Sequence, residues 1–411
     1  MCYNRKMDRT ILHCDMNGFF ASVELLDRPE LVDVPMAVSG NPKNRHGIIL
    51  AKNEIAKAYG VVTAETIGQA KKKCPDLVCV PPHHKKYSYY SKLINEIYGR
   101  YTDMVEPFSV DESWLDVTAS RKLFGVGEQI ADELRDTVKK ELGLTLSAGV
   151  SFNKIFAKMG SEYKKPDATT VISRDNYTEL LWPLPVGELF TCGKATRDKL
   201  IRTGINTIGD LALADKTLLI ALLGEHGGQL HEYANGEDTS PVALSYERSR
   251  IKSVGHGITF SRDLESREDI KTAVTALTDR VCARLRKYQM KAGGVKVEIK
   301  DPSFKVISRQ VQLQIPADTP EVLRSAALDI IDNEWPKGKL IRLITITGIN
   351  LTDNSDPHQL NIFAFGEEQQ KSDALGKTMD AIRGKFGDSS ITYGRIIDND
   401  LGINIHIDDD D

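Results

Sequence analysis

The sequence predicts an α+β protein of several domains. Its 411 residues exceed what a single hydrophobic core usually holds. Residues 253–351 read in order as strand, helix, strand, strand, helix, strand, whereas residues 184–236 read as short helices interrupted by glycines. The N-terminal part alternates short apolar strands with helices. These three patterns assign the α+β class to the chain.

The first expected strand ends in a carboxylate. Ile11–Cys14 is a short apolar strand that runs into Asp15, and Gly18 then marks a turn before an apolar helix. Backbone N–H groups exposed at such a helix start can hold phosphate. A carboxylate beside these amides indicates a site for a phosphate and its counter-ion.

A second acidic stretch lies at residues 109–117. Read as a strand, it sends Glu112, Trp114 and Asp116 to one face and Asp111 to the other. Adjacent acids between apolar residues are costly unless a positive group, most simply a divalent cation, lies beside them. A hairpin turn carrying acids is the simpler interpretation of this stretch alone. With Asp15, however, the three carboxylates suffice for a pair of Mg²⁺ ions and phosphoryl transfer.

Two strands expected in 253–351 have clear period-two alternation, of apolar residues with charged residues in one and with glutamines in the other. Helices expected at about 267–290 and 320–334 can cover their apolar side. The positions expected to be buried are Val295, Val297, Ile299, Val311, Leu313 and Ile315.

Composition indicates a soluble globular protein of the cytoplasm. Hydrophobic residues make up 41% of the chain and charged residues 27%. No apolar run approaches a membrane span, and no secretory segment precedes the first strand. The six cysteines are scattered without a C-x-x-C pair, which suits reduced thiols and gives no zinc signal.

Charge is distributed unevenly along the chain. The net charge is −4, but residues 245–351 carry 19 Lys and Arg against 13 Asp and Glu. Residues 352–411 carry 5 against 13 and end in four aspartates. A basic block of this kind suits a polyanionic partner that the whole-chain sum hides.

Longer motifs make the interpretation specific. Residues 15–24 read Asp-Met-Asn-Gly-Phe-Phe-Ala-Ser-Val-Glu, and residues 109–118 read Ser-Val-Asp-Glu-Ser-Trp-Leu-Asp-Val-Thr. Residues 148–158 and the Lys164-Lys165-Pro166 that follows add further matches. In this order the motifs resemble those of the Y-family DNA polymerases, closest to the bacterial DinB branch (DNA polymerase IV). The resemblance covers residues 9 to 363.

The resemblance implies a right-hand polymerase. Its parts would be a palm at 1–35 and 85–180, small fingers at 36–84, a helix-hairpin-helix thumb at 181–243, a β-α-β-β-α-β little finger at 244–352 and a C-terminal tail at 353–411.

It also implies a metal site. Asp15 and Asp111 would hold two Mg²⁺ ions, for which Mn²⁺ can substitute, and Met16 would add its carbonyl oxygen. Glu112 would complete the site of the ion at the primer terminus.

The incoming dNTP would be held near the start of the first helix. Phe20 matches the steric gate, an aromatic ring that collides with a 2′-hydroxyl, and Phe19 can then be the core residue of the pair. The candidates for nucleotide binding are Gly18, Phe19, Phe20, Arg45, Lys57 and Lys165. The chain departs from the family pattern with Glu54 and Lys57, where an aromatic residue and an arginine are usual.

Contacts to primer–template DNA are expected in two places. The thumb hairpin offers Gly193, Lys194 and Gly204, although Thr191 replaces the first of its two usual glycines. In the little finger, Lys296 and Lys300 lie on the polar side of a strand, where they contact DNA or simply face solvent.

Residues 359–363 resemble the short peptide that binds the sliding clamp, through Gln359, Leu360, Ile362 and Phe363. An edge strand with its apolar pair packed inward is the alternative. A helix is expected at 367–386.

We therefore expect a monomeric, template-directed translesion DNA polymerase that acts in damage tolerance, with low fidelity and no proofreading segment. Two alternatives are a nucleotidyl cyclase, which would not need the thumb, little finger or clamp peptide, and a non-catalytic DNA-binding relative, against which the three carboxylates argue.

Overall fold

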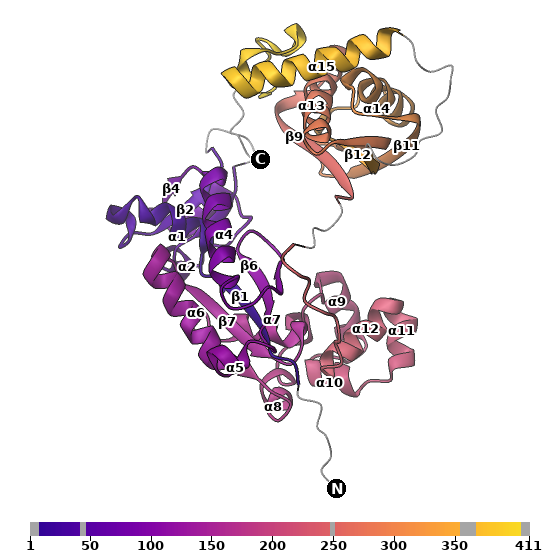
Figure 1. Cartoon of the computed structure of the whole chain (residues 1–411). Helices are drawn as coiled ribbons and strands as arrows, with labels where there is room; N and C mark the ends of the chain where they lie inside the picture. The colour runs from indigo at the N-terminus through magenta and orange to yellow at the C-terminus, as the bar shows by residue number, and fades with distance from the viewer. Residues whose placement is uncertain (1–7, 42–46, 247–250, 354–366, 404–411) are drawn as a thin grey trace. The chain divides into compact units, whose positions relative to one another are not determined.

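A computed structural model describes residues 8–41, 47–246, 251–353 and 367–403. The chain divides into two compact units, one within residues 1–248 and one within residues 249–410 (Figure 1). We call them the N-terminal unit and the C-terminal unit. No helix of the described residues is long and apolar enough to span a bilayer.

The N-terminal unit is built on a five-stranded sheet in the order β5-β6-β1-β7-β8. Its pairs are antiparallel except β7 with β8, which run parallel. The strands are β1 (Ile11–Met16), β5 (Val105–Pro107), β6 (Glu112–Asp116), β7 (Leu146–Ser151) and β8 (Thr169–Ile172). Helix α1 (Phe19–Leu26) follows β1 directly, as expected from the turn at Gly18.

The two faces of this sheet carry different layers. Leu12 and Cys14 of β1 belong to a core shared with α4 (His84–Tyr98) and α6 (Gly127–Leu142). On the opposite face Ile11 packs with Ala157 of α7 (Lys154–Tyr163). Because side chains alternate along a strand, Asp15 lies on the α7 side of the sheet.

Two smaller parts complete this unit. A three-stranded sheet in the order β3-β2-β4 carries two short helices, each with an N-cap side chain, Asn53 or Thr66, that accepts from the first turn. Its elements are β2 (Met36–Ser39), β3 (Ile49–Lys52), α2 (Glu54–Ala58), α3 (Ile67–Lys73) and β4 (Val78–Val80). The second part is helical. Its helices are α8 (Tyr177–Leu181), α9 (Lys194–Arg202), α10 (Ile208–Leu213), α11 (Lys216–Leu223) and α12 (Glu225–Ala234). The short helix α5 (Arg121–Phe124) does not belong to it, and its Phe124 packs against the core that includes α4 and α6.

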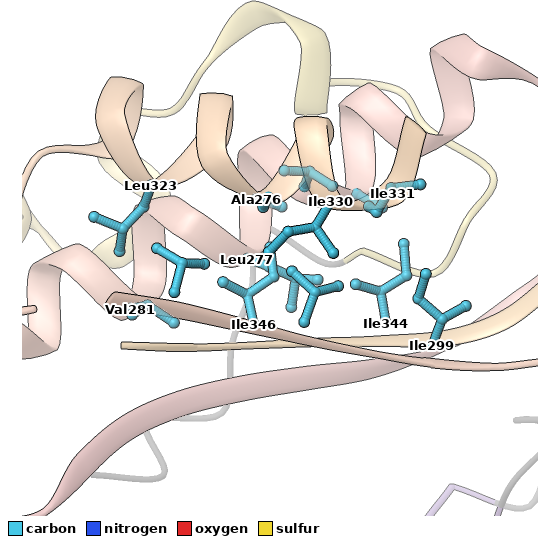
Figure 2. Packing of buried hydrophobic residues seen from close by; sticks show 14 of the residues in the cluster. Ala276, Leu277, Val281, Ile299, Leu323, Ile330, Ile331, Ile344 and Ile346 are labelled. Atoms are coloured by element: carbon cyan, nitrogen blue, oxygen red, sulfur yellow. The ribbon is translucent and has the colours of Figure 1, made fainter. Parts of the chain in front are cut away.

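The C-terminal unit confirms the β-α-β-β-α-β order. Its antiparallel sheet runs β11-β10-β12-β9, and two helices cover one face of it (Figure 2). The elements are β9 (Ser253–Leu264), α13 (Arg267–Lys287), β10 (Met290–Lys300), β11 (Val306–Ala317), α14 (Pro320–Glu334) and β12 (Ile341–Asp353). Val295, Val297 and Ile299 are buried as predicted.

The expected burial of β11 is wrong in part. Leu313 packs against the core, but Val311 is 41% exposed and Ile315 48% exposed. The reason is position: β11 is the edge strand of the sheet, so the helix layer covers it less completely than the central β10. Period-two alternation shows which residues share a face, but not whether that face is covered.

The expected helix at 367–386 is present as α15 (Glu367–Phe386), and the chain after it returns to the unit. Ile396, Leu401 and Ile403 join the core of the sheet and its helices. Arg383 of α15 donates to Asp279 of α13 at 2.7 and 3.1 Å, with both side chains nearly buried. The compact unit thus extends well past residue 352.

Close approach of α7 to β7 gives a first prediction. A Cβ added to Gly149 would lie 1.8 Å from the carbonyl oxygen of Ala157, and Gly160 of α7 faces it. We expect Gly149→Ala to lower the unfolding free energy by about 3 kcal/mol, because backbone cannot give way as a side chain can. Chemical denaturation measures the change.

Gly68→Ala is the matched control. Gly68 lies in α3 with open space around it, so this variant should be neutral or more stable by about 0.5 kcal/mol. Equal stabilities of the two variants would contradict the packing argument.

Candidate active site

Strand register brings two carboxylates together. In the antiparallel pair of β1 and β6, Asp15 lies opposite Glu112, so both side chains project from the same face. Asp111 comes directly before β6, and its carbonyl accepts from the N–H of Met16 at 3.1 Å. The two motifs, about a hundred residues apart in sequence, therefore meet at the same end of the sheet.

A third carboxylate joins them from the helix layer. Asp15, Glu112 and Glu162 each offer an oxygen, and these oxygens lie within 4.8 Å of one another. Glu162 is at the end of α7 and was not among the expected site residues. Its spacing of four residues after Lys158 and three before Lys165, on a helix following a motif strand, is the signal that could have identified it.

The structure does not bring the Asp111 carboxylate into this group. Its Oδ1 instead accepts from the hydroxyl of Ser109 at 2.6 Å in the turn before β6. Burial raises the pKa of Asp111 above its usual range.

Lysines of α7 and the following loop balance the acidic group. Lys165 Nζ lies 2.8 Å from Asp15 Oδ2 and 2.9 Å from Glu162 Oε1. Lys158 Nζ donates to Glu112 Oε2 at 2.8 Å. The buried His13 ring lies 3.6 Å from the same oxygen through Nε2 and bonds Ser161 through Nδ1.

The two opposed carboxylates have very different proton affinities. Burial raises the pKa of Asp15 to about 8, against the opposing effect of Lys165. Burial acts in the same direction on Glu112, but His13 and Lys158 outweigh it and hold the pKa of Glu112 at about 2. Environments that separate two carboxyl pKa values in this way are typical of sites that bind cations or move protons.

The donor set fits a hard divalent cation. It consists of carboxylate oxygens, and the nearby Cys14 thiol faces the core on the other side of β1. A cation would supply charge now contributed by Lys165, and it would lower the pKa of Asp15. Asp15, Glu112 and Glu162 are the residues that would hold it in this arrangement, with Asp111 adjacent.

Gly18 forms the turn between β1 and α1. Gly18 has φ 54° and ψ 41° and caps α1, and a Cβ there would lie 3.2 Å from the carbonyl oxygen of Lys52. Phe19 is buried in the core, whereas Phe20 is half-buried. Phe20 stacks on Tyr87 of α4 with 4.0 Å between ring centroids.

The departures at Glu54 and Lys57 compensate each other. Lys57 Nζ pairs with Glu54 Oε2 at 3.2 Å on the exposed side of α2. The acid thus points to the lysine, although exposed pairs of this kind add little stability. Arg45 lies outside the described residues.

The expected DNA contacts are accessible where they are described. Gly193 caps α9, Lys194 is exposed and Gly204 has φ 88°. Lys296 and Lys300 are half-buried on the polar side of β10, and Lys296 pairs with Glu298 at 3.0 Å. Gln359, Leu360, Ile362 and Phe363 lie outside the described residues.

Comparison with known proteins agrees along the chain. The impB/mucB/samB family model matches residues 14–162, and the model of that family's C-terminal domain matches residues 251–362. A DNA polymerase IV of Acetivibrio thermocellus is 43% identical over 97% of this chain and all of that protein. DNA polymerase IV 1 of Bacillus subtilis is 37% identical over 94% of this chain and 92% of its own length.

A solved structure shares the fold. A Y-family DNA polymerase chimera of Dbh and Dpo4 superposes with a TM-score of 0.75, covering 84% of this chain and all of its own. Its identity of 21% supports the fold and not the details of the site.

The backbone of Thr191 is in a conformation that glycine adopts more easily. It has φ 72°, a left-handed conformation that is unfavourable for a β-branched residue. We expect Thr191→Gly to raise the unfolding free energy by about 1 kcal/mol in chemical denaturation. As a control, the same replacement in helix α11, Thr217→Gly, should lower the unfolding free energy by about 0.3 kcal/mol. Destabilisation by Thr191→Gly would contradict the backbone argument.

Proposed function

The chain belongs to the Y-family DNA polymerases, among the bacterial DNA polymerase IV proteins, and we propose that its acidic cluster performs the nucleotidyl transfer. As a translesion DNA polymerase, it extends a primer along a DNA template with dNTPs. The observation that carries the proposal is the register of Asp15 against Glu112, with three carboxylate oxygens within 4.8 Å. Such a cluster, at the end of β1 that leads into the turn at Gly18, suits two-metal chemistry.

We assign the residues as follows. Asp15 and Asp111 would hold two Mg²⁺ ions, or Mn²⁺ in their place, with the Met16 carbonyl, and Glu112 would complete the primer-side site. When bound, the ions lower the pKa of the primer 3′-hydroxyl and neutralise the leaving pyrophosphate.

Lys165 would act on the triphosphate. Its ammonium group now pairs with Asp15 and Glu162, and this pairing would become unnecessary once cations balance those acids. The freed charge would lie beside Asp15, which precedes the turn at Gly18, and backbone N–H groups of that turn can donate to phosphate oxygens. Lys57 and Arg45 remain further candidates for the same phosphates.

Low fidelity follows from the small fingers. The described residues of 36–80 form three short strands and two short helices, and neither helix is long enough to close over a nascent base pair. A pair that is only loosely enclosed is selected mainly by its own hydrogen bonds and stacking, which tolerates damaged templates.

We also propose a sliding-clamp contact through Gln359, Leu360, Ile362 and Phe363. We propose DNA contacts at Gly193, Lys194, Gly204, Lys296 and Lys300. A monomeric state and a cytoplasmic location complete the proposal. The sequence pattern of each segment supports these proposals. A clamp peptide would raise processivity by increasing the effective concentration of the enzyme at the primer end.

The carboxylates provide the central test. We expect Asp15→Asn and Asp111→Asn to reduce primer extension with Mg²⁺ about a thousandfold, and removal of the metal with EDTA to abolish it. As a control, Asp136→Asn, at an exposed position of helix α6, should leave the rate of primer extension unchanged.

Comparing Asp111→Asn with Glu162→Gln tests which of these two carboxylates binds the metal with Asp15 and Glu112. Loss of extension in Asp111→Asn with activity retained in Glu162→Gln supports the assignment above. The reverse result would transfer the metal-binding role from Asp111 to Glu162, since that is the third carboxylate that the geometry brings to Asp15 and Glu112.

Phe20 tests the nucleotide end of the site. Phe20→Ala should incorporate ribonucleotides far more readily, because the ring that meets the 2′-hydroxyl is removed, while extension with dNTPs continues. Single-nucleotide incorporation kinetics with matched dNTP and rNTP measure this ratio. An unchanged ratio would refute the steric-gate assignment.

A further inference from the structure

The proposed steric gate rests on a second aromatic ring. Phe20 of α1 and Tyr87 of α4 are stacked, with ring planes 13° apart and centroids 4.0 Å apart. Tyr87 is 1% exposed, so it forms the inner layer behind the half-buried Phe20. His84 lies edge-on to both rings. Phe20 therefore has one face supported by a residue that is fixed in the core.

A buried carboxylate fixes Tyr87 in turn. The Tyr87 hydroxyl donates to Glu24 Oε1 at 2.6 Å, and His83 Nδ1 donates to the same oxygen at 2.9 Å. The Glu24 side chain is 3% exposed, a burial that costs free energy unless donors compensate it. Burial, with the Glu24 contact, raises the pKa of Tyr87, so its hydroxyl keeps the proton that it donates.

Glu24 and Phe20 lie on the same helix, four residues apart, so their side chains project from neighbouring positions on one face. The hydrogen bond from Tyr87 to Glu24 thus ties the supporting ring to the helix that carries the supported one. The three residues form a closed arrangement whose geometry does not depend on a loop.

We propose that Glu24 and Tyr87 are positioning residues for sugar discrimination, holding the Phe20 ring where it excludes a ribonucleotide. The inference rests on the proposed function of Phe20. A ring excludes a 2′-hydroxyl only if it cannot move aside, and a displacement of about 1 Å is enough to change rates about a hundredfold. Glu24 restrains that displacement through Tyr87.

Two variants separate positioning from simple packing. Tyr87→Phe keeps the stacked ring and removes its hydroxyl, and Glu24→Gln keeps the shape of the side chain and removes its charge. We expect each to raise the ratio of kcat/KM for rNTP to that for dNTP by about tenfold, mainly through the rNTP value. Single-nucleotide incorporation on primed DNA measures both values.

Tyr101→Phe is the matched control. Tyr101 is also a buried tyrosine, with its hydroxyl 3.5 Å from Thr137, but its ring contact is with Phe124 rather than with Phe20. It should leave the ratio unchanged. Thermal unfolding of all variants records any purely structural effect, which would lower stability without changing the ratio.

Combination with Phe20→Ala tests the coupling. If Glu24 and Tyr87 act through Phe20, then adding Tyr87→Phe or Glu24→Gln to Phe20→Ala should not change the ratio further. An unchanged ratio in Tyr87→Phe and Glu24→Gln, with Phe20→Ala relaxed, would overturn this inference alone. An unchanged ratio in Phe20→Ala would instead overturn the gate on which it rests.

Discussion

The N-terminal unit depends on compensating two carboxylates that the register of β1 and β6 forces together. Asp15 is almost fully buried, and Glu112 lies directly opposite. Like charges in a poorly hydrated place repel strongly and cannot both ionise without positive neighbours. Lys158 and Lys165 supply that charge from α7 and the loop that follows it. The helix layer is therefore an electrostatic requirement of the sheet as well as its cover.

That requirement explains the glycines between helix and sheet. The lysines reach the carboxylates only if α7 lies close to β7, and Gly149 opposite Gly160 permits backbone contact there. On the other face of the sheet, ordinary apolar packing against α4 and α6 is sufficient. The two faces of one sheet thus follow different rules, packing on one side and charge balance on the other.

Much of this could be predicted from the sequence, for identifiable reasons. The strand before Asp15, the turn at Gly18 and the period-two alternation around Val297 are local patterns, and the structure contains them. The spacing of Glu162 marks it only as a neighbour of Lys158 and Lys165, and no local pattern places Tyr87. The proximity of both to the site arises from packing between elements distant in sequence. The exposure of Val311 also depends on strand order, which alternation within a strand does not contain.

The basic block and the acidic segment that follows it in the sequence belong to the same folded unit. Arg262 and Arg286, counted in the basic block, pair with Asp400 and Asp380 of the acidic segment. Over residues 245–411 the chain carries 24 Lys and Arg against 26 Asp and Glu, so the unit has no net surplus of positive charge.

Attraction to DNA must then come from where the charges lie. Helix α15 packs on α13, which covers the apolar side of the sheet (Figure 1). Asp380 of α15, which pairs with Arg286 of α13, is therefore separated by the helices and the sheet from the polar side on which Lys296 and Lys300 lie. Lys296 pairs with Glu298 on this same side, so the charge that the unit offers to DNA depends on the local arrangement of its lysines and acids rather than on its net charge.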